Sequence, residues 1–365
     1  MGRIRGPGVK PEELHLIIPG PIDQRTGGYL YDAHMAAGLE RLGWTVVVHS
    51  LDGDFPDGDA QAEASLASVL AGLPEGTRVL LDGLAMGALP GPILAHATRL
   101  RVLGLVHHPL ADETGLDAVQ KDRFRTLERE ALSACMGVLC TSAFTATRLE
   151  VYGVPTARVR AVPPGTEPAP RALGPAEGEA PRLLCVGTVV PRKGQDVLVR
   201  ALARLRHLRW SCVCAGNLDK APTYASAVRT QAVEEGLSDR LAFTGKCGQS
   251  ALDDLYHSAS LFVLPSHHEG YGMALTEALA HGLPIVSTTG GAVPHTVPDA
   301  AAILVTPGDE AGLADALGYL LASPAGALRR ARMASAARAH ARTLPTWERA
   351  ASAFAQAILE LSPVE

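Results

Sequence analysis

Short apolar runs alternate with helical stretches along the whole chain. In the first half the runs are, in order, Leu14 to Ile18, Thr45 to His49, Val79 to Leu81, Val102 to Val106, Gly137 to Cys140 and Val159 to Val162. In the second half they are Arg182 to Val186, Ser211 to Ala215, Leu241 to Phe243, Leu261 to Leu264, Pro284 to Ser287 and Ala302 to Val305. This alternation predicts parallel sheets with right-handed crossovers, and six strands per half predict an α/β fold of two Rossmann-like, doubly wound domains.

A segment rich in proline, glycine and alanine separates the two halves, from Pro163 to Pro181. It cannot continue a helix or a central strand. We therefore expect an amino-terminal Rossmann-like domain over residues 1–168, a linker over 169–181 and a carboxyl-terminal Rossmann-like domain over 182–345. Residues 346–365 are expected to form a helix that crosses back to the first domain. A length of 365 residues and an apolar fraction of 47% suffice for two cores, and two domains imply a cleft.

The charge and cysteine content narrow the class of protein. A net charge of −5 gives no general attraction to nucleic acid, so no nucleic-acid partner is expected. The six cysteines lie mostly in apolar runs without paired zinc spacing, as expected of reduced core thiols. The first dozen residues lack the apolar stretch of a secretory signal, and no run approaches the ~20 apolar residues of a membrane span. These features predict a cytoplasmic protein, with peripheral membrane contact as a further possibility.

Ligands of open parallel sheets bind beyond the carboxyl ends of the strands, so the residues after each apolar run are candidates for a site. The first such loop, Gly20 to Gly28, precedes a helix with an expected apolar stripe of Met35, Leu39 and Leu42. The two adjacent glycines at the start of this helix would let a phosphate approach backbone amides. An ordinary strand-to-helix turn is the alternative, because no complete Gly-x-Gly-x-x-Gly pattern is present.

Two adjacent histidines, His107 and His108, follow the strand expected at Val102 to Val106. An imidazole at a strand end can hydrogen-bond a bound sugar, although histidine at a strand end is often structural. Neighbouring side chains of an extended strand point in opposite directions, so at most one ring is expected to line the cleft directly. We expect that ring to be His107.

The loop from Gly187 to Gly194 follows the first strand of the second half and contains two consecutive cations, Arg192 and Lys193. Such a pair stabilises a diphosphate both when it is bound and when it departs with new negative charge. The loop lacks the Gly-x-x-x-x-Gly-Lys-Ser/Thr pattern of NTPases. A solvated turn is the less favoured alternative.

The segment from Ser266 to Glu277 follows the strand expected at Leu261 to Leu264. Its glycines free the backbone around Glu269, and a helix is expected to begin near Gly272. The amino end of that helix offers amides and a positive dipole to phosphate or to sugar hydroxyls. We expect the Glu277 carboxylate to accept bonds from ribose hydroxyls, and the Glu269 carboxylate to bind hydroxyls of a sugar.

Glu269 and Glu277 are separated by seven residues and preceded by a strand and by Pro265-Ser266. This arrangement resembles the paired-glutamate motif of the retaining glycosyltransferases of family 4. Further landmarks of that family are matched in order by Gly27-Gly28, His107, Arg192-Lys193, Gly245-Lys246 and Gly290-Gly291. The resemblance covers nearly the whole chain, and one departure is Pro294-His295, where the family commonly has Pro-Glu.

The resemblance implies a GT-B fold, in which two Rossmann-like domains face one cleft, with the nucleotide on the carboxyl-terminal domain and the acceptor on the amino-terminal one. It implies transfer of a hexose from a UDP- or GDP-sugar to an unidentified sugar, lipid-linked or small-metabolite acceptor, with retention of anomeric configuration. It also implies that no cofactor and no metal are required.

The resemblance further implies roles for individual residues. Arg192 and Lys193 would clamp the diphosphate, Glu277 would hold the ribose, and Glu269 would contact the donor sugar. His107 would meet sugar hydroxyls near the reacting carbon. The other expected contacts with the nucleotide-sugar are Gly27, Gly28, Gly187, Thr188, Gly245, Lys246, Gly270, Tyr271, Gly272 and Met273, and the expected contacts with the acceptor or sugar are His108 and Glu113.

Other functions fit parts of the same pattern. A nucleotide-sugar-binding protein without transfer activity would keep the donor site and lack a working acceptor site. A nucleotide-sugar epimerase or a sugar phosphorylase would share the architecture. A zinc enzyme built from His107, His108, His267 and His268 is disfavoured, because these histidines lack the two-turn spacing of helical zinc ligands.

Overall fold

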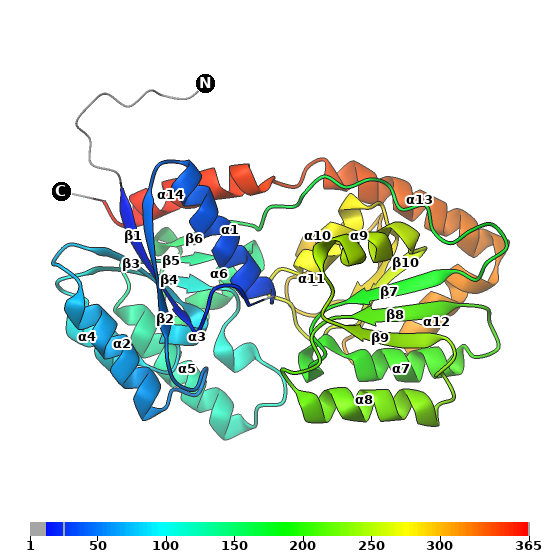
Figure 1. The fold of residues 1–365 in the computed structure, drawn as a ribbon, viewed down its shortest axis with the longest axis horizontal. Coiled ribbons are helices and arrows are strands. Elements are labelled where there is room, and N and C mark those ends of the chain that lie inside the picture. Colours follow the sequence, from blue (N-terminus) through cyan, green and yellow to red (C-terminus); the bar gives the residue numbers. More distant parts are fainter. Residues whose placement is uncertain (1–11, 25, 364–365) are drawn as a thin grey trace. The chain divides into compact units, whose positions relative to one another are not determined.

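The computed structural model describes residues 12–24 and 26–363, which form two α/β units, each with its own parallel sheet (Figure 1). The first unit contains the described residues up to Asp112, Leu116–Pro163, and the chain from Trp347 onwards. The second contains Glu113–Gly115 and Pro164–Thr346. The expected fold class, with two Rossmann-like doubly wound domains, is confirmed.

The first sheet has six parallel strands in the order β2-β1-β3-β4-β5-β6. All six coincide with apolar runs of the first half: β1 (Glu13–Pro19), β2 (Thr45–Leu51), β3 (Arg78–Asp82), β4 (Arg101–Val106), β5 (Gly137–Cys140) and β6 (Val159–Ala161). Strands β3, β4 and β5 are buried along almost their whole length. Helices cover both faces of such a sheet, which explains why its strands are continuously apolar rather than alternating.

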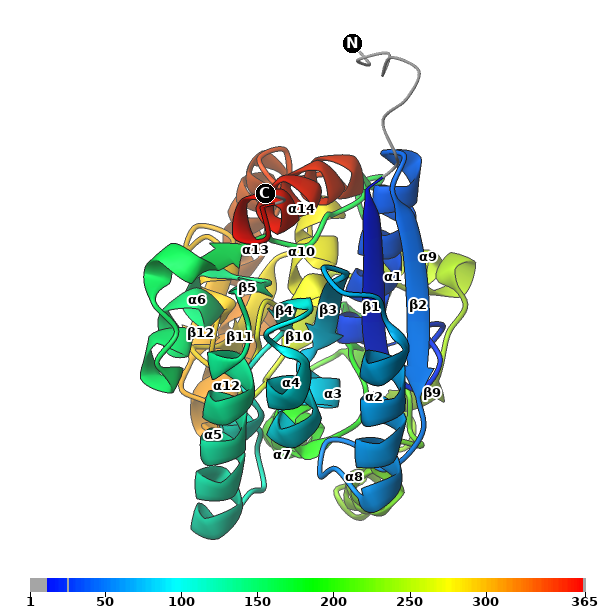
Figure 2. The ribbon, with the colours of Figure 1, turned by 90° about the vertical axis from the view of Figure 1, so that its left-hand side faces the viewer.

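Two layers of helices enclose this sheet (Figure 1 and Figure 2). Helices α1 (Gly27–Arg41) and α14 (Trp347–Leu361) cover one face, and α2 (Ala60–Gly72), α4 (Pro90–His96) and α5 (Ala118–Ser133) cover the other. Shorter helical segments are α3 (Gly83–Met86), α6 (Ala143–Leu149) and the 3₁₀ turns Leu110–Asp112, Glu150–Tyr152 and Thr156–Arg158.

The apolar stripe of α1 differs from the expectation at its end. Met35 and Leu39 are buried, but Leu42 is 42% exposed. The reason is that α1 ends at Arg41, so that Leu42 is the capping residue outside the helix, and Gly43, with a φ of +85°, then turns the chain away from the helix axis.

Helix α14 supplies part of the core of the first unit. The ring of Tyr31 on α1 meets Trp347 and Phe354 edge-on, with centroid distances of 6.4 and 6.0 Å. Arg78 Nε, at the start of β3, donates a hydrogen bond of 3.3 Å to the Ser362 carbonyl oxygen. Helix α14 is therefore an integral layer of a unit whose last strand ends at Ala161.

The second sheet has the strand order β12-β11-β10-β7-β8-β9, again all parallel. Its strands coincide with the apolar runs of the second half: β7 (Arg182–Val186), β8 (Ser211–Ala215), β9 (Leu241–Gly245), β10 (Leu261–Leu264), β11 (Ile285–Thr288) and β12 (Ala302–Val305). Its helices are α7 (Gln195–Arg204), α8 (Pro222–Glu234), α9 (Gln249–Ser258), α10 (Met273–Ala280), α11 (Val293–Thr296), α12 (Glu310–Ala322) and α13 (Pro324–Ala341). Helices α7 and α8 lie on one face, and α9 and α10 on the other (Figure 1).

Each sheet has one point where the strand order reverses: between β1 and β3 in the first sheet, and between β7 and β10 in the second. Loops that leave neighbouring strands at such a point run to opposite faces and open a crevice at the carboxyl ends of the strands. The loops after β7 and β10 are those that carry Lys193 and Glu269. The topology thus brings two of the sequence motifs to the same crevice.

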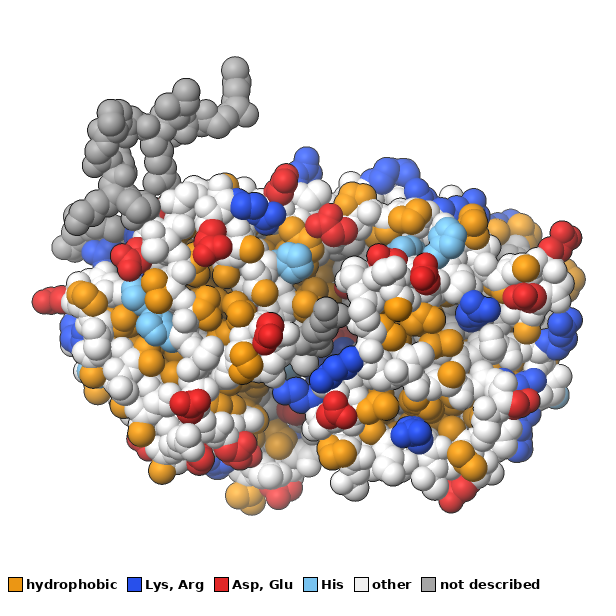
Figure 3. Space-filling view, in the orientation of Figure 1, with side chains coloured by type: hydrophobic (Ala, Val, Ile, Leu, Met, Phe, Trp, Pro, Cys, Tyr) orange, Lys and Arg blue, Asp and Glu red, His pale blue; other side chains and the backbone are white. Residues whose placement is uncertain are grey.

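No helix in the described part of the chain is long and apolar enough to cross a membrane. Five of the six cysteines are buried and Cys247 is half-buried, and no two of them form a disulfide bond in the described chain. On the face seen in Figure 3, acidic and basic side chains are interspersed.

Candidate functional site

Two loops of the second unit meet in the crevice between β7 and β10. The loop after β7 forms a 3₁₀ turn, Pro191–Lys193, and the loop after β10 carries Glu269. Lys193 Nζ donates a hydrogen bond of 2.6 Å to Glu269 Oε1. Arg192 Nη1 lies 3.6 Å from Glu269 Oε2. The two cations therefore share one carboxylate.

Glu269 is almost completely buried, with 4% of its surface exposed. Burial alone raises the pKa of a carboxyl group. Here the charges of Lys193 and Arg192, the hydrogen bond from Lys193 and a 2.6 Å hydrogen bond from Ser266 Oγ outweigh burial, and they lower the pKa of Glu269 to about 2. Glu269 is an anion at neutral pH, and both of its oxygens are engaged in orienting the cations.

Arg192 connects the crevice to Glu113, which the sequence predicts as a contact for acceptor or sugar. Arg192 Nε lies 3.2 Å from Glu113 Oε2, and its Nη1 donates 2.9 Å to the carbonyl oxygen of His268. The backbone of the two loops is joined as well, since His267 N donates 2.7 Å to the Arg192 carbonyl oxygen. The contacts of the guanidinium group with Glu113, the His268 carbonyl oxygen and Glu269 fix it in one orientation.

Close backbone approach at this crevice requires glycine at two positions. Gly194 has a φ of +67°, and a Cβ there would lie 2.2 Å from the Pro265 carbonyl oxygen. Gly291 has a φ of +63°, and a Cβ there would lie 2.3 Å from the Glu269 carbonyl oxygen. Any larger residue would separate the loops or displace Glu269, so these glycines position the cluster.

A cavity of about 300 Å³ opens within the second unit beside the Arg192 turn. Its wall includes a hydrogen-bonded pair, in which Tyr224 Oη donates 2.6 Å to Asp196 Oδ1. The lining residues are Thr114, Gly115, Pro191, Asp196, Tyr224 and His267.

Four further residues that were predicted to contact the nucleotide-sugar lie at the carboxyl ends of β7 and β9. Gly187 follows β7, and a Cβ there would lie 3.5 Å from the Lys193 side chain. The carbonyl oxygen of Thr188 accepts a bond of 3.1 Å from Gln195 Nε2. Gly245 ends β9, and the exposed Lys246 Nζ lies 3.5 Å from Asp219 Oδ2.

Glu277 lies on α10 and is bound separately from Glu269. Tyr256 Oη donates a hydrogen bond of 2.8 Å to Glu277 Oε2, and the Tyr256 ring stacks on His281 with a centroid distance of 4.8 Å. Burial raises the pKa of Glu277, and the Tyr256 bond opposes this rise. The Tyr256 hydroxyl therefore holds the Glu277 carboxylate in place, a contact that was not predicted from the sequence.

The amino end of α10 carries the predicted segment from Gly270 to Met273. Gly272 precedes the helix with a φ of +96°, and no side chain caps this end through a hydrogen bond. The carbonyl oxygen of Tyr271 accepts 2.6 Å from Thr296 Oγ1, and burial raises the pKa of the Tyr271 hydroxyl to about 12. The amino end of α10 thus offers backbone amides, and the hydrogen bond from Thr296 on α11 fixes the segment that carries them.

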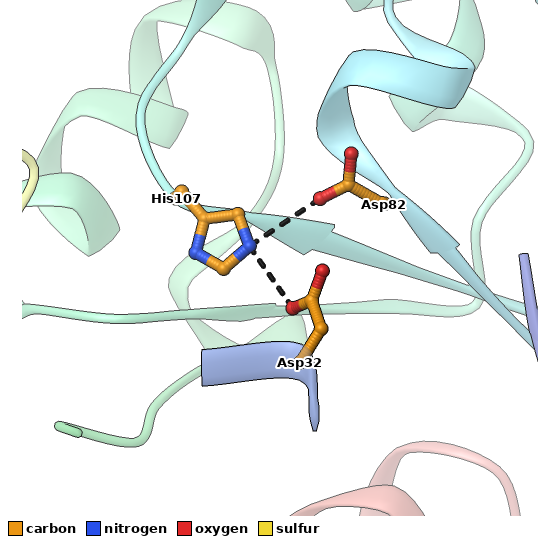
Figure 4. A group of neighbouring side chains, drawn as sticks. All are labelled: Asp32, Asp82 and His107. Atoms are coloured by element: carbon orange, nitrogen blue, oxygen red, sulfur yellow. Dashed lines mark hydrogen bonds and ion pairs between the residues drawn. The ribbon is translucent and has the colours of Figure 1, made fainter. Parts of the chain in front are cut away.

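In the first unit, His107 lies against two buried carboxylates (Figure 4). His107 Nε2 is 3.1 Å from Asp32 Oδ1 and 3.3 Å from Asp82 Oδ2. Asp32 comes from α1, Asp82 ends β3, and His107 follows β4. This trio stands beside the point where the first sheet reverses its strand order.

The trio is charged near neutral pH. Burial alone lowers the pKa of an imidazole, but Asp32 and Asp82 outweigh burial and raise the pKa of His107 to about 10. Burial raises the pKa of Asp32 to about 6, and the charge of His107 limits that rise. The two shifts favour a protonated His107 paired with an ionised Asp32 near neutral pH.

Of the two glycines at the start of α1, only Gly28 lies close to another described side chain. A Cβ at Gly28 would lie 3.3 Å from His107 Cδ2, whereas a Cβ at Gly27 would meet no atom within 4 Å. Gly28 therefore makes room for the imidazole ring. His108 is half-buried, and His107 is the histidine that lies against Asp32 and Asp82.

Asp32, Asp82 and His107 are also the group in the described chain whose metal-ligand type atoms lie together, within 4.8 Å. The same distances are those of an ion pair between a protonated His107 and the two carboxylates. The four histidines of the zinc alternative are divided between the two units.

Sequence reasoning missed Asp32, Asp82, Ser266 and Tyr256 as members of these clusters. Asp82 ends an apolar strand, which is a signal that the reading of strand ends could have used. Asp32 is a buried acid four residues after Gly28, on the core side of α1. Its partner is set by the strand order, which no local pattern encodes.

Residues 170–340 match the protein family described as Glycosyl transferases group 1. The matched range contains the Arg192, Lys193, Glu269 and Glu277 positions. The D-inositol 3-phosphate glycosyltransferase of Xylanimonas cellulosilytica is 34% identical over 222 residues, which are 56% of this chain and 52% of the relative. The chain thus spans about half the length of that relative.

A second relative aligns over more of the chain. The GDP-mannose-dependent alpha-(1-6)-phosphatidylinositol monomannoside mannosyltransferase of Mycolicibacterium smegmatis is 28% identical over 334 residues, which are 87% of this chain and 83% of the relative. Among solved structures, sucrose-phosphate synthase from Thermosynechococcus elongatus is similar in fold, with a TM-score of 0.79 and 22% identity, over 94% of this chain and 98% of that one. Residues 170–340 therefore match the glycosyl transferases group 1 family, and the chain has the two-domain GT-B fold.

Proposed function

We propose that the protein is a retaining hexosyltransferase that needs no metal, and that it transfers a hexose from a nucleoside-diphosphate sugar to a hydroxyl group of an acceptor. The observation that carries this proposal is the cluster of Arg192, Lys193 and Glu269 in the crevice between β7 and β10. It lies inside the domain that matches the glycosyltransferase family.

The cluster suits a diphosphate leaving group. When the bond between the sugar C1 and the diphosphate oxygen breaks, negative charge grows on the diphosphate. Arg192 and Lys193 are already oriented by Glu269, so they stabilise that charge without reorganising. Glu269 itself is an unsuitable nucleophile, since Lys193, Arg192 and Ser266 occupy its oxygens.

We propose that Glu277 binds the ribose hydroxyls of the donor, with Tyr256 holding its carboxylate in place. The segment from Gly270 to Met273 would present its amides to the donor at the start of α10. The names of the two relatives favour a GDP-linked mannose as donor and an inositol-containing acceptor as the first pair to test. UDP-sugars are the competing donors.

The test begins with binding. Thermal unfolding of the full chain is measured with GDP, UDP and a panel of their sugars at millimolar concentration, because a ligand of the folded state raises the midpoint by mass action. We expect stabilisation by one nucleotide class. No shift with any nucleotide or nucleotide-sugar would count against the donor site.

Transfer is tested with the stabilising donor and a panel of inositol-containing and sugar acceptors. The anomeric proton of the product, followed by NMR, should show the configuration of the donor, and activity should persist in excess EDTA. Binding without transfer to any acceptor would favour the binding-protein alternative. An inverted product or a loss of activity in EDTA would contradict the mechanism.

A further inference from the structure

In the first unit, two buried carboxylates, Asp32 and Asp82, favour the protonated form of the His107 ring, which the sequence alone does not indicate. Both neighbouring carboxylates lie on the Nε2 side of the ring, and Nδ1 points away from them (Figure 4). Asp32 is 2% exposed and Asp82 is 3% exposed, so little water competes for the pairing. A buried cation of this kind is stabilised only while its partners stay ionised.

We infer that Asp32 and Asp82 are positioning residues that hold His107 as an imidazolium ion, so that its Nδ1–H serves as a cationic hydrogen-bond donor to an oxygen of the substrate and the ring does not act as a general base. This inference rests on the proposed transfer function for the identity of the substrate. The charge state of the ring stands independently of it.

The surroundings of the ring support a fixed orientation. Asp82 is held by its own hydrogen bond, in which Leu84 N donates 2.9 Å to Asp82 Oδ1. The ring of Tyr31 meets the His107 ring edge-on with a centroid distance of 5.5 Å, and a Cβ added at Gly28 would lie 3.3 Å from His107 Cδ2. The two carboxylates, the Tyr31 ring and the nearby Gly28 backbone therefore hold the imidazole in one orientation.

The titratable groups in contact with the ring come from two elements. Asp32 and Tyr31 belong to α1, and Asp82 ends β3. Burial raises the pKa of Tyr31 well above its usual value, and its hydroxyl donates 2.9 Å to the Val162 carbonyl oxygen, so Tyr31 stays neutral. The two carboxylates are thus the groups that set the charge of His107.

A ring that is charged at neutral pH restricts the chemistry of transfer. An imidazolium has no lone pair for the proton of the acceptor hydroxyl. In the proposed reaction the C1–oxygen bond to the diphosphate breaks, and a bond from C1 to the acceptor oxygen forms. The acceptor proton must then pass to the departing diphosphate oxygen, and His107 contributes charge and a hydrogen bond only.

The inference is tested first by NMR of the full chain labelled with ¹⁵N-histidine, with His107 assigned by the His107→Gln variant. We expect both ring nitrogens to carry protons at pH 7.5 and to titrate only near pH 10. In Asp32→Asn and Asp82→Asn the midpoint should fall by at least about one pH unit, because each variant removes one neighbouring charge. Asp57→Asn, a carboxylate of the same unit paired with Arg123, should leave it unchanged.

Activity gives the second readout. In Asp82→Asn, the pH above which kcat/KM falls should move down together with the NMR midpoint of the ring, because activity then follows the loss of the ring proton. His107→Gln should lose activity by the same factor at every pH. A neutral ring at pH 7.5, a midpoint unmoved in both Asn variants, a loss independent of pH in Asp82→Asn, or His107 signals that shift on adding Mg²⁺ would each overturn the inference.

The two proposals fail in different ways. If no nucleotide-sugar is turned over by the wild-type protein, the proposed function fails, and the NMR titration still decides the charge of His107. If transfer occurs and the ring is neutral, only the positioning role of Asp32 and Asp82 is lost.

Discussion

Lys193 and Glu269 are 76 residues apart in the chain, and a hydrogen bond of 2.6 Å joins Lys193 Nζ to Glu269 Oε1. The cation that we expect at the diphosphate is therefore oriented by a carboxylate from the loop of another strand. Each residue depends on the other for its charge environment, which makes the pair the first target for mutation.

We predict that Lys193→Ala lowers kcat/KM by about 10²- to 10³-fold, the loss typical of removing one preorganised donor to a developing negative charge. The Glu269 carboxylate then keeps Arg192 and Ser266 and loses its closest cation, so the free energy of unfolding should fall by about 1–3 kcal/mol. Steady-state kinetics and urea unfolding measure the two effects. Lys121→Ala, on α5 of the first unit, is the matched control, and wild-type kinetics in Lys193→Ala would remove this residue from the site.

The Tyr256–Glu277 contact predicts an effect on donor binding. Tyr256→Phe keeps the stacking on His281 and removes the hydrogen bond to the carboxylate. We expect KM for the donor to rise about 5- to 50-fold with kcat changed less, because a bond to a charged group contributes about 1–3 kcal/mol. Tyr319→Phe changes a half-exposed tyrosine on α12 and should be silent. A fall in kcat with an unchanged KM would place Glu277 elsewhere in the reaction.

Glycine at position 291 predicts a loss that backbone strain alone does not explain. Gly291→Ala adds a Cβ 2.3 Å from the Glu269 carbonyl oxygen at a φ of +63°. Gly236→Ala has nearly the same φ, +67°, and meets no atom within 4 Å. Both should lose about 1 kcal/mol of stability from the left-handed backbone. Gly291→Ala should lose more, together with at least about tenfold in kcat/KM. Equal losses would show that position 291 does not position Glu269.

Glu128 predicts how stability depends on pH. This carboxyl group on α5 is 3% exposed, Leu110 N donates 2.9 Å to its Oε1, and burial raises its pKa to about 8. The folded protein keeps the proton that the unfolded chain releases near pH 4.5, so this group's contribution to stability is present below about pH 4.5 and is lost as the pH rises to 8. Glu128→Gln should therefore gain stability relative to the wild type between pH 5 and pH 9 in urea unfolding. Glu130→Gln, exposed on the same helix, is the control, and parallel profiles for wild type and Glu128→Gln would contradict the prediction.

The fold followed from the sequence because buried parallel strands are continuously apolar. β10, for example, was expected at Leu261 to Leu264 and lies there, with all four residues buried. The expected grouping of motifs at strand ends followed from the same rule. Asp32 and Tyr256 could not be predicted as partners of His107 and Glu277, because each pairing depends on which helix packs over which strand. Long-range packing determines this choice, and the residues within one helical turn of Asp32 or Tyr256 do not indicate it.

The return of α14 to the first unit has a consequence for biosynthesis. Residues 164–346 form a contiguous stretch that is translated before α14. The unit that contains β1 lacks the aromatic rings of Trp347 and Phe354 until α14 has been synthesised. The half of the molecule that is translated first is thus the half that matures last, and a premature stop codon before position 347 would leave the Tyr31 side of α1 uncovered.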